Sequence, residues 1–122
     1  MKILIVDDER FITDSLVTIF SKEGYETHGV YSAELARELL FEWAPDLAII
    51  DFCLPNMNGL DLAILVKTEC PNCRLLLFDS QITTKHILEN ARHEGLVFDV
   101  VAKPVHPKDL LNWAKDIREF QH

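Results

Sequence analysis

Short apolar runs alternate with longer segments of helical period along the whole chain. Two of these runs, Ile3-Leu4-Ile5-Val6 and Leu47-Ala48-Ile49-Ile50, are continuously apolar, which is typical of strands buried on both faces of a parallel sheet. The pattern as a whole predicts strands at residues 2–6, 25–30, 46–51, 74–79 and 97–102. Each strand is followed by a segment with the apolar spacing of a helix, so the chain predicts five strand-helix units.

The five predicted helices differ in how wide an apolar stripe they carry. Their apolar positions are Ile12, Leu16, Ile19 and Phe20 in the first; Ala36, Leu39, Leu40 and Trp43 in the second; Leu60, Ala63, Ile64 and Val66 in the third; Ile87, Leu88 and Ala91 in the fourth; and Leu110, Ala114 and Ile117 in the fifth. Asn58-Gly59 signals a turn before the third helix, Pro71 ends it, and Pro107 suits the first turn of the fifth. The fourth helix, around residues 83–94, has the thinnest stripe, and we expect it to be docked less firmly than the others.

Strand-helix units of this kind predict a doubly wound α/β fold, in which helices cover both faces of a five-stranded parallel sheet and the crossovers are right-handed. The common strand order for five strands is 2-1-3-4-5, and its switch point lies between the first and third strands. Because the chain of 122 residues has no low-complexity tract or internal linker, we expect one domain spanning residues 1–122.

The amino-acid composition limits which binding partners and which cellular compartment we expect for the protein. The net charge is −8 and no basic cluster offsets it, so we expect no direct binding of nucleic acid. The longest apolar stretches are far shorter than a membrane span, and the N-terminus lacks the longer apolar region of a signal peptide. We therefore expect no membrane association and a cytoplasmic protein.

Acidic residues follow two of the predicted strands directly. Asp7 and Asp8 follow the first strand, and Asp51 ends the third. In the order 2-1-3-4-5 these two strands are neighbours, so the acids meet in one crevice at the carboxyl edge of the sheet. Three carboxylates in one crevice repel each other unless a cation compensates them. Oxygen ligands of this type suit Mg²⁺, which keeps part of its hydration shell for a phosphate group.

The same edge of the sheet receives a hydroxyl and an ammonium group. Ser80 follows the fourth strand and Lys103 follows the fifth. Asp51 lies between them and the acid pair, so a phosphoryl group on Asp51 would meet metal, hydroxyl and ammonium together. Phosphoryl transfer requires such positioning and charge neutralisation. Asp51 is therefore the predicted nucleophile, which would form an acyl phosphate.

These residues carry a resemblance that covers essentially all 122 residues. The segments ILIVDDE, LAIIDFCLPNMNGLDL and VVAKP, with a hydroxyl residue after the fourth strand, resemble the receiver domain of two-component response regulators. The resemblance implies that a histidine kinase or phosphotransfer protein donates phosphate to Asp51. It implies that the backbone carbonyl of Cys53 joins the three acids in holding Mg²⁺, and that Ser80 and Lys103 detect the phosphorylated state. It also suggests that the Lys103-Pro104 bond is cis.

The sequence departs from the family pattern around the predicted hydroxyl group and the fifth strand. Asp79 and Gln81 flank Ser80 where smaller or apolar residues are usual, although strand alternation should point Asp79 away from Ser80. The position three residues before Lys103, usually aromatic, is Val100, and Phe98 is the nearest aromatic residue. The usual aromatic switch is therefore in question.

Two hypotheses of function remain open. In the first, the domain is a phosphoacceptor switch rather than an enzyme, although it could promote its own phosphorylation and dephosphorylation. Phosphorylation then alters a partner-binding face formed by the fourth helix, the fifth strand and the fifth helix. In the second, it is a pseudo-receiver, a binding module that works without phosphorylation. The cognate kinase, the regulated process, an output domain after residue 122 and a homodimer are all left open.

Other functions that the sequence could suggest are supported less well by its motifs. A phosphatase of the haloacid-dehalogenase type needs a second acid two residues after the nucleophile, where this chain has Cys53. Cys70-Pro-Asn-Cys73 has the spacing of a redox pair, but it follows the third helix instead of starting one, so we expect a turn. A zinc site would need two more soft ligands. The five histidines show no ligand spacing and are expected at the surface.

Overall fold

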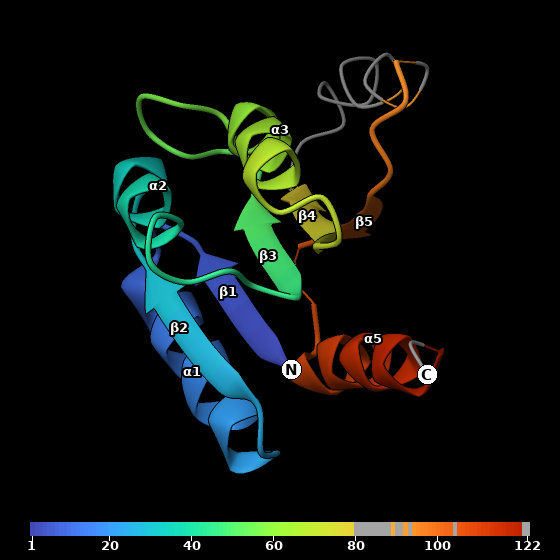
Figure 1. Ribbon diagram of the computed structural model, residues 1–122. Coiled ribbons are helices and arrows are strands. Elements are labelled where there is room, and N and C mark those ends of the chain that lie inside the picture. Colours follow the sequence, from blue (N-terminus) through green and yellow to red (C-terminus); the bar gives the residue numbers. More distant parts are fainter. Residues whose placement is uncertain (80–88, 90–91, 93, 104, 121–122) are drawn as a thin grey trace.

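A five-stranded parallel sheet in the order β2-β1-β3-β4-β5 forms the centre of the molecule (Figure 1). The computed structural model describes residues 1–79, 89, 92, 94–103 and 105–120. The strands are β1 (Lys2–Val6), β2 (Glu26–Val30), β3 (Leu47–Asp51), β4 (Arg74–Asp79) and β5 (Asp99–Ala102). The helices are α1 (Arg10–Lys22), α2 (Ala33–Leu39), α3 (Gly59–Glu69) and α5 (Pro107–Phe120). The predicted fold class and strand order are confirmed.

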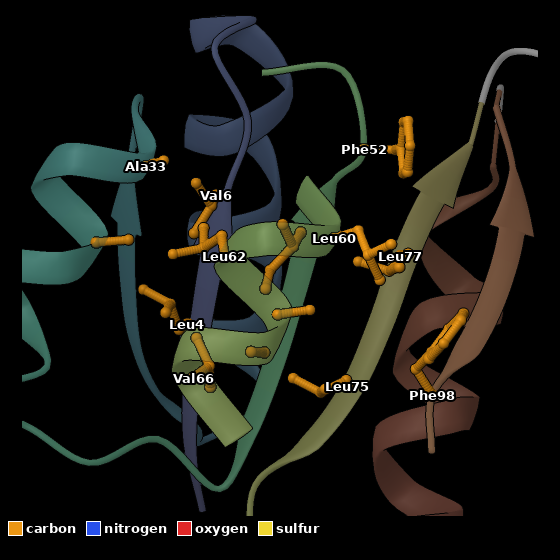
Figure 2. Packing of buried hydrophobic residues seen from close by; sticks show 14 of the residues in the cluster. Leu4, Val6, Ala33, Phe52, Leu60, Leu62, Val66, Leu75, Leu77 and Phe98 are labelled. Carbon is orange, nitrogen blue, oxygen red and sulfur yellow. The ribbon is translucent and has the colours of Figure 1, made fainter. Parts of the chain in front are cut away.

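Side-chain alternation along the central strands divides the core into two layers. Ile3 and Ile5 of β1 pack with the buried residues of α1 and α5, whereas Leu4 and Val6 pack with those of α2 and α3. Figure 2 shows this second layer, in which Leu62 and Val66 of α3 lie over the sheet. The two faces are covered as Figure 1 shows, with α2 and α3 on one side and α1 and α5 on the other. Because both faces are covered, the interior positions of the central strands, such as residues 3–6 of β1 and 47–50 of β3, are all apolar.

The second helix is shorter than its apolar spacing predicts. α2 ends at Leu39, and the chain then turns, so Trp43 lies beyond the helix. Pro45 disfavours helical backbone at Ala44, so it sets an outer limit on this helix but does not by itself account for the end at Leu39. Trp43 still packs against the α2 and α3 side of the core, and its indole Nε1 donates to the Glu26 carboxylate at 3.3 Å. Trp43 is therefore apolar because it packs against the core from the turn, and not because it belongs to the helix.

Smaller differences concern strand and helix edges. β5 begins at Asp99, two residues later than predicted, and Ile64 of α3 is about half exposed despite its place in the predicted stripe. The predicted helix around residues 83–94 falls largely outside the described residues. In the described part of the chain, no helix combines the length and apolar character that crossing a membrane requires.

Candidate active site

The carboxyl ends of β1 and β3 lie side by side at one edge of the sheet. Val6 of β1 pairs with Ile50 of β3, so the residues that follow them, Asp7 and Asp51, are brought together. Asp51 in turn pairs with Phe78 of β4, and Asp79 pairs with Ala102 of β5 immediately before Lys103. The strand order thus brings residues from three distant parts of the sequence together at one edge of the sheet.

Asp7 is held in place by its surroundings on several sides. It is fully buried, and its Oδ1 accepts a hydrogen bond from the Glu9 N–H at 2.9 Å. Its backbone carbonyl accepts from the hydroxyl of the buried Thr13 at 2.7 Å, and its N–H donates to the Val30 carbonyl at 3.3 Å. Asp8, in contrast, is exposed. The acid pair is therefore asymmetric, with one fixed interior carboxylate and one at the mouth of the site.

Asp51 lies in a tight junction between β3 and α3. It is only 3% exposed, and its Oδ1 accepts from the Cys53 N–H at 3.3 Å. α3 begins at Gly59, whose N–H donates to the Phe52 carbonyl at 2.7 Å. A Cβ atom at Gly59 would lie 2.2 Å from the backbone oxygen of Asp51, too close for any side chain. Gly59 is thus required for the start of α3 to approach the backbone of Asp51, and not only for a turn.

Lys103 places its ammonium group among carboxylates of the site. Its Nζ lies 2.8 Å from Asp7 Oδ2, 3.4 Å from Asp51 Oδ2 and 3.4 Å from Glu9 Oε1. Burial acts to lower the pKa of Lys103, but the hydrogen bond to Asp7 and the negative charges of Asp51, Asp7 and Glu9 outweigh it. The pKa is consequently raised above its ordinary value, and Lys103 carries a positive charge at neutral pH.

The electrostatics of the site disfavour a bare carboxylate at Asp51. Burial and the neighbouring charge of Asp7 raise the pKa of Asp51 to about 6, although Lys103 and the Cys53 N–H oppose the shift. Among the residues that the structure describes, the ammonium group of Lys103 therefore does not fully compensate the acids. This arrangement suits a second, more highly charged cation.

The three predicted acids have the arrangement of a metal site. Asp7, Asp8 and Asp51 each offer a carboxylate oxygen, and these atoms all lie within 4.8 Å of one another. Hard oxygen ligands with one exposed member suit Mg²⁺, which retains water molecules in its shell. The residues present therefore fit this ion.

Comparison with known proteins agrees with this geometry. The family model described as response regulator receiver domain matches residues 3–115. The chain belongs to the response regulator receiver domain family. Receiver domains are signalling domains of two-component systems, and the resemblance found in the sequence is thereby confirmed.

Solved receiver domains share the whole fold. A CheY-like response regulator receiver domain protein from Methanospirillum hungatei JF-1 is 30% identical, with 95% of this chain and 91% of that chain covered and a TM-score of 0.82. NtrX from Brucella abortus, solved in complex with ATP, is 28% identical with a TM-score of 0.83; the match covers 97% of this chain and 27% of NtrX. This receiver domain thus spans about a quarter of the length of NtrX.

Three structural features of the receiver site were not predicted from sequence. The contact of Glu9 with Lys103, the bond from Thr13 to the Asp7 carbonyl and the close approach of Gly59 to Asp51 all depend on tertiary packing. A local signal existed only for Gly59, because a glycine directly after a turn residue also permits close backbone approach.

Several predictions for the receiver domain fall on residues that the structure does not describe. Ser80, Gln81 and the Lys103-Pro104 bond are among them, and so is the side-chain direction of Asp79. The carbonyl of Cys53 stays a predicted metal ligand.

Phe98, the aromatic residue nearest to Val100 in sequence, is buried on the α2 and α3 side of the core. The guanidinium carbon of Arg92 lies 4.8 Å from the centre of its ring.

The cysteine pair of the receiver domain forms the expected turn. The Cys73 N–H donates to the Cys70 carbonyl at 2.9 Å, between the end of α3 and the start of β4. Burial raises the pKa of Cys70, and burial together with the charge of Cys70 raises that of Cys73 to about 12. Both thiols are therefore protonated at neutral pH, unlike the reactive thiolate of a redox pair.

Proposed function

We propose that this receiver domain is a phosphoacceptor switch in which Asp51 takes a phosphoryl group from the phosphohistidine of a histidine kinase or phosphotransfer protein. The observation that carries this proposal is the position of the buried Asp51 carboxylate, which lies beside both the ammonium group of Lys103 and the acids Asp7 and Asp8. Such a cluster of charges has no structural need, since burying like charges is unfavourable. It suits a nucleophile that receives a phosphoryl group.

In the proposed reaction, a carboxylate oxygen of Asp51 attacks phosphorus, and the P–N bond to the histidine of the donor breaks. The bonding electrons return to the imidazole, which is released with a proton, and an acyl phosphate forms on Asp51. The Cys53 N–H holds the other carboxylate oxygen at 3.3 Å and so orients the attacking group. Lys103 is close enough to offset charge on the phosphoryl oxygens.

Asp7, Asp8, Asp51 and the carbonyl of Cys53 are the proposed Mg²⁺ ligands. The bound ion would supply charge neutralisation for the phosphoryl oxygens. Ser80 is the proposed hydroxyl contact to the phosphoryl group. The resulting conformational change is proposed to reach a partner or output domain through residues 83–94, β5 and α5.

A groove beside the site offers a surface for the donor protein. It has a volume of about 510 Å³ and is bordered by Glu9 and Lys103 at one end and by Ile12, Val105 and Phe11 elsewhere. Phe11 is 85% exposed although it is a large aromatic residue. An exposed aromatic residue in a groove that also includes Lys103 of the site suits a protein-binding surface.

The direct test is phosphorylation by a small phosphodonor. Wild-type protein incubated with Mg²⁺ and acetyl phosphate should gain the mass of one phosphoryl group in intact mass spectrometry, and Asp51→Asn should not. Asp116→Asn, on the exposed face of α5, is the matched control and should behave like wild type. A wild-type protein that gains no mass would overturn the proposal and favour the pseudo-receiver alternative. That alternative would also be supported by normal signalling from an Asp51→Ala protein.

A further inference from the structure

Lys103 and the proposed metal would share two of the same carboxylate groups, those of Asp7 and Asp51. The ammonium group contacts Oδ2 of both Asp7 and Asp51, and both residues belong to the group that fits Mg²⁺. A divalent ion and an ammonium group cannot occupy one position between two carboxylates, since both are cations and repel each other. Binding of Mg²⁺ therefore requires Lys103 to move away from at least part of its present contacts.

Glu9 offers Lys103 a position outside the metal cluster. Its carboxylate lies 3.4 Å from Lys103 Nζ, and its side chain is 62% exposed, compared with 14% for Lys103. The backbone of Glu9 is fixed: its N–H donates to Asp7, and its carbonyl accepts from the N–H groups of Ile12 and Thr13. The carboxylate can thus follow the ammonium group while its attachment point stays in place.

The space needed for this movement is present. Glu9 and Lys103 both border the groove of about 510 Å³ described above. The long side chain of Lys103 can therefore shift outward along the groove without leaving the edge of the sheet. A lysine ammonium on a flexible stem suits such a shift better than a rigid guanidinium group.

From these contacts we infer that Glu9 is a positioning residue, which holds the ammonium group of Lys103 at the mouth of the site while Asp7 and Asp51 bind Mg²⁺. The inference rests on the proposed function. Without Glu9, the remaining partners of Lys103 among the described residues would be Asp7 and Asp51, and the ammonium group would compete more strongly with the metal. The loss of a nearby negative charge would weaken Mg²⁺ binding in the same direction.

The test is a Mg²⁺ titration of the whole chain followed by the amide NMR signals of Asp7 and Asp51. Glu9→Gln should weaken Mg²⁺ binding about two- to fivefold, which is the range expected for an exposed ion pair. Glu34→Gln is the matched control, since Glu34 is an exposed acid in the first turn of α2 and is not a partner of Lys103. It should change the affinity by less than about twofold, as a remote exposed charge is screened.

Two further variants distinguish the Glu9–Lys103 contact from the general effect of the Glu9 charge on Mg²⁺ binding. In a Lys103→Met background, Glu9→Gln should weaken Mg²⁺ binding clearly less than it does in the wild-type protein, because the contact with Lys103 is already absent and only the loss of charge remains. Glu9→Asp keeps the charge but shortens the reach by one methylene group, and it should weaken binding as Glu9→Gln does. Glu9→Asp therefore still tests the contact between Glu9 and Lys103 if the Lys103→Met protein fails to fold.

The outcomes distinguish the two proposals. If wild-type protein binds Mg²⁺ but Glu9→Gln and Glu9→Asp match it, the role of Glu9 is overturned and the proposed function stands. An equal loss from Glu9→Gln with and without Lys103 would also overturn it. If the wild-type protein binds no Mg²⁺, the proposed function fails and the inference fails with it.

Discussion

Residues of the same type near the site differ in burial and in hydrogen bonding. Asp7 is buried and fixed by several hydrogen bonds, whereas Asp8, the next residue, is exposed. Thr13 and Thr18 lie on the same helix, and both donate hydroxyl hydrogen bonds to a backbone carbonyl. Only the bond from Thr13 to Asp7 is buried. Burial therefore decides which of these contacts supports the site.

Thr13→Val should lower the free energy of unfolding by about 1–3 kcal/mol, because the buried Asp7 carbonyl loses its hydroxyl donor while the shape is kept. Chemical denaturation would measure this change. Thr18→Val is the matched control, since its hydroxyl bond to Asp14 is exposed, and it should change stability by less than about 0.5 kcal/mol. Equal effects of the two substitutions would contradict the role given to Thr13.

The raised pKa of Asp51 should be visible in the pH dependence of stability without Mg²⁺. The pKa is about 6 in the folded protein against an ordinary value of 3.8, so the folded state binds this proton more tightly. The resulting stability is fully present below pH 4 and is lost as pH rises through 6, with a size on the order of 3 kcal/mol at most.

Asp51→Asn removes this titration. Denaturation of both proteins in chelator should show wild type losing stability relative to Asp51→Asn between pH 4 and pH 7. The difference between the two proteins isolates Asp51 from other acids. A difference that does not vary with pH would show that the pKa of Asp51 is not raised.

At the scale of elements, the site depends on how α3 begins. Asn58 caps the helix, and its side-chain oxygen accepts from the Asp61 N–H at 2.8 Å. Gly59 then brings the first turn against the backbone of Asp51 and Phe52. The end of β3 and the start of α3 therefore form one close-packed junction that fixes the backbone of Asp51.

Gly59→Ala should destabilise the protein by several kcal/mol, because the added Cβ would lie 2.2 Å from the Asp51 backbone oxygen. In a helix free of this contact the same change stabilises by about 0.5–1 kcal/mol, so the expected sign is reversed. The melting temperature of the variant, compared with that of the wild-type protein, would measure this change in stability. A variant as stable as wild type would mean that the junction can open without cost.

At the scale of the whole molecule, the site joins strands that are far apart in sequence. Asp7 follows β1, Asp51 ends β3, and Lys103 follows β5, so a ligand held by these residues links three strands of the sheet. Ligand binding at this edge should consequently stabilise the whole domain by mass action.

Mg²⁺ should raise the melting temperature of the wild-type protein. At a concentration 100 times the dissociation constant, the expected stabilisation is about 2.7 kcal/mol. Asp7→Asn should reduce this gain strongly, whereas Asp116→Asn, which removes the same charge from α5, should leave it intact. Differential scanning fluorimetry measures both. A similar gain in all three proteins would contradict a metal site at Asp7.

Much of this protein was predictable from local pattern. The two apolar runs that lead into Asp7 and Asp51 imply strands buried on both faces, and strand-helix alternation implies a parallel sheet with a small choice of strand orders. That order alone places Asp7, Asp8, Asp51 and Lys103 at one edge, because every parallel strand ends on the same side.

Tertiary structure decided what those residues experience. Local pattern could not show that Asp7 is buried and Asp8 exposed, that Gly59 must contact Asp51, or that Glu9 and Lys103 meet across 94 positions of sequence. Burial, pKa and ion pairing are sums over neighbours from distant segments, which exist only when the chain has folded. The sequence thus determined which groups meet, and the packed structure determined their charge, their exposure and their partners.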